Sequence, residues 1–491
     1  MRKTFFAVGL AVCPALALAQ SVPASLSLAD AIAIARDNNP AYRQTLATRT
    51  ASLWGARSAW ANLLIPTANL SGGIGYSGPG SQNFLSTSFS QPVSTSSSDY
   101  SLSLQWQLSG QTLAAPGQQH ANADAVDADI VGARAALVNN VTQQYLTALQ
   151  SRDNAAVTEK QLESADEALK LAQAKFAVGS GTLLDVRQAQ VARGQAEVAL
   201  LQAQTDVLVQ KLKLFEQMGV AAPVDLKSVT LSDSFPVTEP TWSLDDLLAM
   251  AQAQNPALQA FEARATAAKW SVRASTAAYG PSVSLSASWS GFTQRFNNLD
   301  PLITSAQLSG NANYLACQDN DTIRVHAGLA PEGGCGNLLF GAAQEQAMIS
   351  QNNQYPFNFT RQPFQAQLRI SIPLWSNFQQ PLQVSQAKAN QEQADQAARA
   401  QSLALRTQVS NGYLTLATAY QTIAIQDTNR TAAQDQLKLA TDRYRVGSGT
   451  FLDVVNAQVT AIKAETDYVS AVYNYHKARA ALEAAVGRPL H

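Results

Sequence analysis

A sixteen-residue stretch occurs twice in the chain, and this duplication constrains the fold more than any other feature. Residues 175–190 read KFAVGSGTLLDVRQAQ and residues 443–458 read RYRVGSGTFLDVVNAQ, with ten identical positions at a constant offset of 268. Chance does not produce such an ungapped match, so the chain is predicted to consist of two related halves.

Each copy has the pattern of a sharp turn between two long helices. Glycines supply positive-φ positions that end the first helix. A threonine then caps the second helix, with an aspartate three residues later as the carboxylate of a capping box. The residues are Gly179, Gly181, Thr182 and Asp185 in the first copy and Gly447, Gly449, Thr450 and Asp453 in the second.

Residues 1–19 predict a secretory signal peptide, with a basic start, an apolar run and a small-x-small cleavage site at 17–19. A lipoprotein signal using Cys13 is the alternative, which bulky Val12 and the following Pro14 disfavour. Removal of the signal leaves 32 basic and 35 acidic residues, a net charge of −3. This charge gives no basis for binding nucleic acid or an acidic membrane surface.

The mature chain keeps two cysteines, Cys317 and Cys335, and in an oxidising compartment we expect them to form a disulfide rather than a metal site. No later stretch has 18 consecutive apolar residues, so no transmembrane helix is predicted after the signal.

Both halves open with a capping box, Ser27 to Asp30 and Ser243 to Asp246, on a short helix that stops before an Asn-Pro pair. A helix of about 25 residues follows each pair. These boundaries place the first repeat at 20–218, an equatorial link between the repeats at 219–242, the second repeat at 243–487 and a tail at 488–491.

The hydrophobic period then changes from about 3.6 to 2, which predicts four strands near 67–77, 99–109, 282–292 and 364–374. Strands of about ten residues cross an outer membrane when tilted. A half-buried sheet in a soluble domain is the alternative. The serine- and glutamine-rich polar face, and tryptophans near the strand ends, favour a barrel with a wet lumen.

The loops between the strands differ in length. Residues 78–98 form a serine-rich loop, whereas residues 297–362 form a long loop that holds both cysteines. We expect this insertion on the extracellular surface as a variable loop, with a receptor or plug role left open.

Long helical hairpins are predicted at 116–218 and 381–486, and their first helices would be roughly 90–100 Å long. Leu162, Ala165, Leu169, Ala172 and Phe176 have the 3-4-3-4 spacing of a coiled-coil seam. Four strands cannot close a barrel, and an open sheet edge cannot lie in lipid, so several chains must share the barrel. Two chains would give eight strands, and three would give twelve with room for a lumen.

This layout, with VGSGTLLDV and VGSGTFLDV in tandem, resembles the TolC-like outer-membrane efflux proteins over essentially the whole mature chain. The resemblance implies a mixed α+β membrane protein: a homotrimer with a 12-stranded β-barrel, four strands per chain, continued by a long α-helical coiled-coil barrel. It implies a passive duct of a tripartite efflux or type I secretion system in a Gram-negative bacterium. The barrel would lie in outer-membrane lipid and the helices in the periplasm, with a periplasmic adaptor and an inner-membrane pump as partners.

The resemblance also assigns site residues by position. The turns would form the adaptor-docking tip, namely Gly179, Ser180, Gly181, Thr182, Gly447, Ser448, Gly449 and Thr450. The periplasmic gate would contain Asp185, Tyr444, Asp453 and Asn456. Asn456 stands where the family has a second ring aspartate, and Gly449 where it has a gate arginine. We therefore expect weaker cation binding at the tip and a different closing network.

An enzyme is not predicted, because the four histidines are scattered and no catalytic, cofactor or metal-binding motif is present. His120 and His476 are expected on helix surfaces. The alternative function is a periplasmic adaptor or a coiled-coil scaffold. Such an adaptor would carry one hairpin flanked by small β-domains, whereas this chain has two hairpins and amphipathic strands. The sequence does not choose the exported substrate or the pump.

Overall fold

The computed structural model describes residues 25–84, 87–91 and 93–490, so the expected signal peptide and Cys13 lie outside the described residues. The chain divides into two compact units. The helical unit comprises residues up to 54, 120–268 and 390 onward, and the sheet unit comprises 55–119 and 269–389. Each unit is described by itself.

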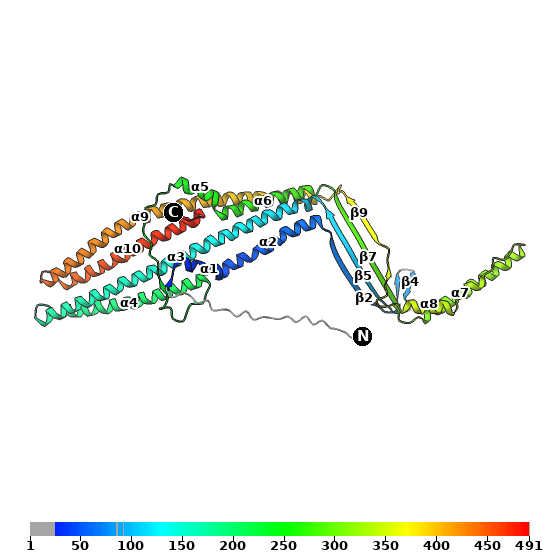
Figure 1. Cartoon of the computed structure of the whole chain (residues 1–491), viewed down its shortest axis with the longest axis horizontal. Coiled ribbons are helices and arrows are strands. Elements are labelled where there is room, and N and C mark those ends of the chain that lie inside the picture. The colour runs from blue at the N-terminus through cyan, green and yellow to red at the C-terminus, as the bar shows by residue number, and fades with distance from the viewer. Residues whose placement is uncertain (1–24, 85–86, 92, 491) are drawn as a thin grey trace. The chain divides into compact units, whose positions relative to one another are not determined.

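Two long helical hairpins dominate the helical unit (Figure 1). The first consists of α3 (Gly110–Ala177) and α4 (Leu183–Met218), and the second of α9 (Gln379–Arg445) and α10 (Phe451–Val486). The first residues of α3 and α9 belong to the sheet unit. None of the helices in the described ranges combines the length and the apolar character needed to cross a membrane.

The helix α3 begins at Gly110 rather than at the expected residue 116, and Pro116 lies inside it. The Ser109 backbone N–H donates to Thr112 Oγ1 at 2.8 Å, and the Thr112 N–H donates to Ser109 Oγ at 3.3 Å. This reciprocal pair starts the helix ahead of the proline.

Each repeat closes on itself through an asparagine that precedes a proline. Asn39 Nδ2 donates to Gln217 O at 2.8 Å, and Asn255 Nδ2 donates to Ala485 O at 2.9 Å. Each amide therefore joins the end of a hairpin to the start of its own repeat. The helices joined are α1 (Leu28–Asn38), α2 (Pro40–Leu64) and α4 in the first repeat, and α5 (Leu244–Gln254), α6 (Pro256–Ala277) and α10 in the second.

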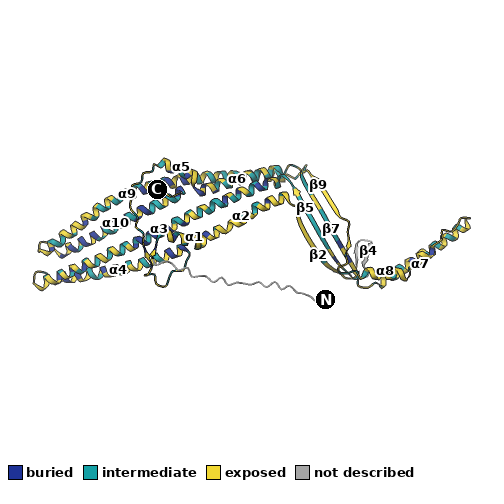
Figure 2. Ribbon diagram, viewed as in Figure 1, coloured by how far each residue is buried: buried dark blue, intermediate teal, exposed yellow. Residues whose placement is uncertain are grey.

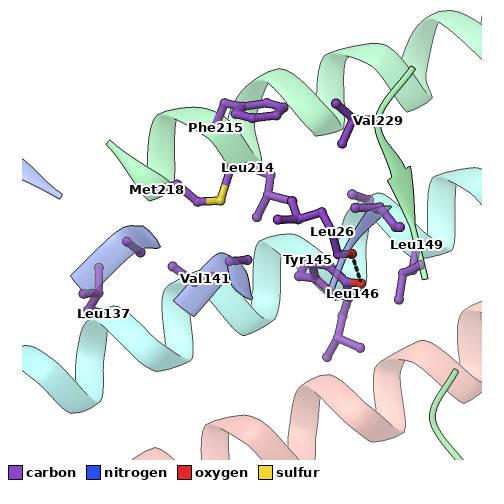
Figure 3. Packing of buried hydrophobic residues seen from close by; sticks show 14 of the residues in the cluster. Leu26, Leu137, Val141, Tyr145, Leu146, Leu149, Leu214, Phe215, Met218 and Val229 are labelled. Carbon is purple, nitrogen blue, oxygen red and sulfur yellow. Dashed lines mark hydrogen bonds between the residues drawn. The ribbon is translucent and has the colours of Figure 1, made fainter. Parts of the chain in front are cut away.

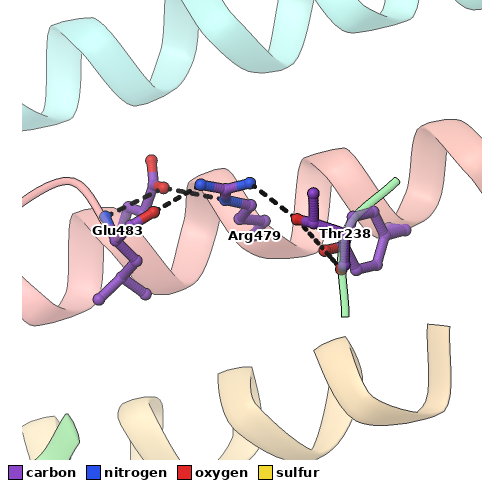
Figure 4. A network of polar contacts seen from close by, with 5 residues as sticks. Thr238, Arg479 and Glu483 are labelled. Atoms are coloured by element: carbon purple, nitrogen blue, oxygen red, sulfur yellow. Dashed lines mark hydrogen bonds and ion pairs between the residues drawn. The ribbon is translucent and has the colours of Figure 1, made fainter. Parts of the chain in front are cut away.

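The link between the repeats is anchored on both hairpins. Its strand β6 (Thr230–Leu231) pairs in parallel with β1 (Ser25–Leu26), and Leu26 lies in an apolar core against α3 and α4 (Figure 3). The hydroxyl of Tyr145 in α3 donates to Leu26 O at 2.9 Å. On the other hairpin, Arg479 of α10 donates to Thr238 Oγ1 at 3.5 Å and to Glu483 at 3.2 Å (Figure 4).

His476 is buried on α10, so the expectation of a surface histidine was wrong, whereas His120 is exposed and pairs with Asp124. The ring of Phe235, from the link between the repeats, lies 5.6 Å from the His476 ring. Burial lowers the pKa of His476 below its usual value. A helical pattern alone does not reveal this, because the covering residue is far away in the sequence.

The sheet unit contains an antiparallel sheet in the order β2-β5-β7-β9, and the two-residue β8 (Thr360–Arg361) also pairs with β7. The strands are β2 (Thr67–Ser77), β5 (Thr95–Leu108), β7 (Ser282–Phe296) and β9 (Gln365–Ser371). Thus β5 begins four residues before the expected start, β7 continues four residues beyond the expected end, and β9 is shorter than expected.

The register places apolar residues of neighbouring strands opposite one another. Trp106 in β5 is opposite Leu285 in β7, which is opposite Leu368 in β9. Leu70 in β2 is likewise opposite Leu102 in β5. Side chains alternate between the two faces of a strand, so these residues share one face. This apolar face is largely uncovered in the chain, since Leu70, Leu285 and Leu368 are all exposed. Figure 2 shows that β2 and β9 are exposed along most of their length.

Both loops contain regular structure, which the sequence analysis did not predict. Residues 78–98 contain the hairpin of β3 (Gly80–Phe84) and β4 (Thr87–Gln91). Residues 297–362 form α7 (Asp300–His326), the short helix η1 (Cys335–Leu338) and α8 (Ala342–Asn352). A disulfide between Cys317 and Cys335 joins α7 to η1. The insertion is therefore a folded element rather than a plain loop.

Candidate functional site at the hairpin turns

The two glycine turns have the same backbone construction. In the first, the N–H groups of Ser180 and Gly181 donate to Lys175 O at 2.9 and 3.0 Å, and Gly179 has φ 76°. These bonds satisfy a carbonyl at the end of α3 that has no helical partner. The second turn repeats the pattern with Ser448, Gly449, Arg443 and Gly447.

The capping boxes expected from the spacing are present at both turns. The Asp185 N–H donates to Thr182 Oγ1, and the Thr182 N–H donates to Asp185 Oδ2, both at 3.1 Å. In the second turn the Thr450 N–H donates to Asp453 Oδ2 at 3.0 Å and the Thr450 hydroxyl at 2.8 Å. These donors hold the pKa of Asp453 below its usual value.

Tyr444, at the end of α9, is buried where the two hairpins meet. Its ring packs edge-on against Phe451 at 5.4 Å, and both side chains belong to one apolar cluster with Ala172 and Val186 of the first hairpin. The Tyr444 hydroxyl has no hydrogen-bond partner among the described residues. Burial, and then the charge of Asp185, raise the pKa of Tyr444. The structure therefore brings these two expected gate residues near each other without a hydrogen bond between them.

The remaining gate positions differ in their surroundings. Asn456 is exposed on α10, three residues beyond Asp453 and so on the same side of the helix. A Cβ atom added to Gly449 would lie 3.1 Å from the Cβ of Arg443. A side chain at position 449 would therefore crowd the start of its own turn.

The sequence did not predict two kinds of residue that hold the helical unit together. Asn39 and Asn255 were used only as helix stops, although each closes a repeat. Lys175 was not singled out, although its side chain reaches across to the end of α9. The only sequence signal for Lys175 was a basic residue in the last turn of a helix.

The family model for the outer membrane efflux protein matches residues 31–220 and 341–488, which is more than half of the chain. The chain belongs to this family. The match spans both long hairpins and both glycine turns, whereas β7 and most of the insertion lie outside it.

One curated relative of this family member is the outer membrane efflux protein BepC of Brucella suis biovar 1 (strain 1330), with 25% identity over 344 residues. This alignment covers 70% of the chain and 61% of BepC, so the chain spans about three-fifths of the relative's length.

Solved structures of similar fold include three outer-membrane proteins. VceC of Vibrio cholerae has 19% identity and a TM-score of 0.68, with coverage of 94% of this chain and 97% of VceC. CmeC of Campylobacter jejuni has 15% identity, a TM-score of 0.68 and coverage of 94% and 85%. MtrE of Neisseria gonorrhoeae, solved in an open state, has 17% identity, a TM-score of 0.66 and coverage of 94% and 89%. At these identities the likeness shows the fold.

Asp453 has a capping role in the structure, and we expect a second role at the tip. In purified protein in a planar lipid bilayer, Asp453→Ala should weaken the block of current by multivalent cations, because one of the carboxylates available to bind them is lost. It should also lower the melting temperature, because a cap is lost. Asp246→Ala is the matched control, since Asp246 pairs with the N-cap Ser243 of α5. Unchanged cation block with a lower melting temperature would leave Asp453 with capping alone.

Proposed function

We propose that the chain is one subunit of a homotrimeric outer-membrane channel that passively exports substrates delivered by an inner-membrane pump. The observation that carries this proposal is the sheet, which has one exposed apolar face and two outer strands, β2 and β9, each paired on one side among the described residues. Unpaired backbone groups at such edges are not tolerated in lipid, so further strands must cover them.

The strand directions favour identical copies as the partners. Neighbouring strands alternate in direction from β2 to β9, so β9 runs antiparallel to β2. The free edge of β9 in one copy can therefore pair with β2 of the next in the same antiparallel manner as inside the chain. Three copies give a closed barrel of twelve strands, whose apolar face meets lipid and whose serine- and glutamine-rich face lines a wet lumen.

A comparison of the two turns also supports a ring of copies. Tyr444 and Phe451 are buried against the first hairpin, whereas their counterparts in the first repeat, Phe176 and Leu183, are 46% and 52% exposed. In a ring, the second hairpin of a neighbouring copy would lie beside the first hairpin of this one. Phe176 and Leu183 would then be covered in the same way as their counterparts.

Family membership supports the partners that we propose. The helical unit would extend into the periplasm of a Gram-negative bacterium as an α-helical barrel, and its glycine turns would receive a periplasmic adaptor. The pump would select the cargo, through either tripartite efflux or type I secretion. A periplasmic adaptor or a coiled-coil scaffold would expose the apolar face of the sheet to water. This disfavours both alternatives.

Purification from the outer-membrane fraction tests the proposal. Unheated protein should migrate as a trimer on a denaturing gel, and boiled protein as a monomer. The trimer should produce discrete current steps in a planar lipid bilayer. Recovery of the protein from the periplasmic fraction without detergent, as a monomer that gives no conductance, would contradict the proposal.

A further inference from the structure

We propose that Lys175 is a latch that holds the two hairpin turns of one chain together and thereby favours the closed state of the channel. Its Nζ donates to Tyr444 O at 2.5 Å and to Arg445 O at 3.4 Å, and it lies 4.6 Å from the centre of the Tyr444 ring. Lys175 belongs to α3, and both acceptors belong to α9, so the contact joins separate hairpins of the helical unit.

The chemistry of the contact suits a cation. The carbonyls of Tyr444 and Arg445 lie at the C-terminal end of α9, where the helix dipole is negative and the i+4 helical donors are missing. The Tyr444 carbonyl also accepts from the Gly447 N–H at 3.2 Å and has a second lone pair for the lysine. An ammonium group satisfies them with charge-assisted hydrogen bonds and is also attracted to the face of the tyrosine ring. Because the Tyr444 side chain is buried between the hairpins, the lysine fixes a residue that already belongs to the core there.

The internal repeat shows that this contact is not a general feature of the turns. Arg443 occupies the corresponding position in the second repeat, and its backbone carbonyl accepts the same two turn N–H groups. Its side chain instead reaches back toward its own turn, with Nη2 at 3.4 Å from Ser448 O. The two turns have the same backbone construction, but their basic side chains bind different groups. Lys175 contacts the other hairpin, whereas Arg443 contacts its own turn.

Lys175 also supplies a basic group near the turn where Gly449 replaces the gate arginine of the family. Gly449 offers no side chain at the second turn, whereas Lys175 brings a basic group from the first hairpin to the helix end that leads into the same turn. A second polar link, from Gln458 Nε2 to Ser164 Oγ at 3.2 Å, lies farther from the turns. Any opening that separates the turns of the two hairpins must first break the contacts of Lys175. This role in gating rests on the proposed channel function.

Single-channel recording tests the latch. We expect Lys175→Met, which keeps an apolar stem and removes the ammonium group, to raise the ratio of open to closed time by about tenfold for each subunit that carries it, which is the typical weight of one hydrogen bond to a charged group. Lys175→Arg should restore the wild-type ratio, because a guanidinium group is also a cationic donor. Lys170→Met, which removes an exposed lysine of the same helix, should have no effect.

Two results of the recordings would overturn the latch: Lys175→Met with the wild-type ratio, or Arg443→Met with an equal rise, which would point to tip charge in general. Hydrogen exchange of residues 444–450 separates this question from the channel proposal, because it needs no conductance. Lys175→Met should speed exchange there, and Lys170→Met should not. Faster exchange in a protein without conductance would support the contact and contradict the channel. Unchanged exchange in a conducting protein would contradict the latch alone.

Discussion

Leu368→Arg should prevent the chain from assembling as the proposed trimer in the outer membrane. Leu368 is 64% exposed on the apolar face of the sheet, opposite Leu285 of β7. An arginine on the lipid-facing side of a barrel costs about 2–4 kcal/mol near the bilayer midplane, and a homotrimer carries the substitution in every subunit. The measurement is the fraction of protein recovered from outer membranes as a heat-modifiable trimer.

The neighbouring residue provides the matched control. Gln367 lies on the opposite face of β9, opposite Ser286 of β7, so Gln367→Arg should place its charge in the wet lumen and leave assembly intact. Assembly of both variants to wild-type levels would contradict a lipid-facing apolar side. Loss of assembly in Gln367→Arg alone would mean that the faces are assigned the wrong way round.

Gly219→Ala should destabilise the helical unit by about 2–5 kcal/mol, because two costs add. Gly219 ends α4 with φ 73°, a left-handed conformation that disfavours any side chain. A Cβ atom there would also lie 2.7 Å from Asn38 O and from the Cα of Asn39, which are backbone atoms of the junction that closes the first repeat. Thermal unfolding followed by circular dichroism measures the effect.

Gly447→Ala separates the two costs. Gly447 has φ 83°, but no atom lies within 4 Å of the added Cβ, so this variant should lose only about 1–2 kcal/mol for the left-handed backbone. An equal loss in both variants would show that the junction at Asn39 moves aside for a methyl group. A larger loss at Gly447 would mean that the turn, and not the junction, limits stability.

The features that could be predicted from the sequence are those encoded by neighbouring residues. The capping boxes at Thr182 and Thr450 depend on a threonine and an aspartate three residues apart, and both form. Alternation of the kind seen from Leu102 to Trp106 is a local signal, so the four strands could be located. The bounds of β2 and the start of β7 agree with the prediction, whereas both ends of β5 and β9 and the end of β7 differ from it. The proline at 116 predicts a helix start there, but the Ser109–Thr112 pair begins the helix earlier.

Features that depend on distant partners could not be predicted in this way. Asn39 bonds to a carbonyl 178 residues away, so its junction role leaves no local pattern. The Lys175 latch pairs groups 269 and 270 residues apart. The helix α7 lies in a segment for which the sequence predicts a loop, because its three asparagines, two serines and single glycine weaken the helical signal. The gate roles of Asp185, Tyr444, Asp453 and Asn456 stay predictions.

The insertion between β7 and β8 is held together by contacts within itself. The disulfide joins α7 to η1, and a Cβ atom at Gly310 would lie 2.9 Å from Phe340 N, so the helix and the segment after it lie in close contact. Substitutions along α7 can therefore change the surface of this element while the pairing of β7 with β5 stays as it is. The same property makes it a natural place to graft an epitope or a binding peptide.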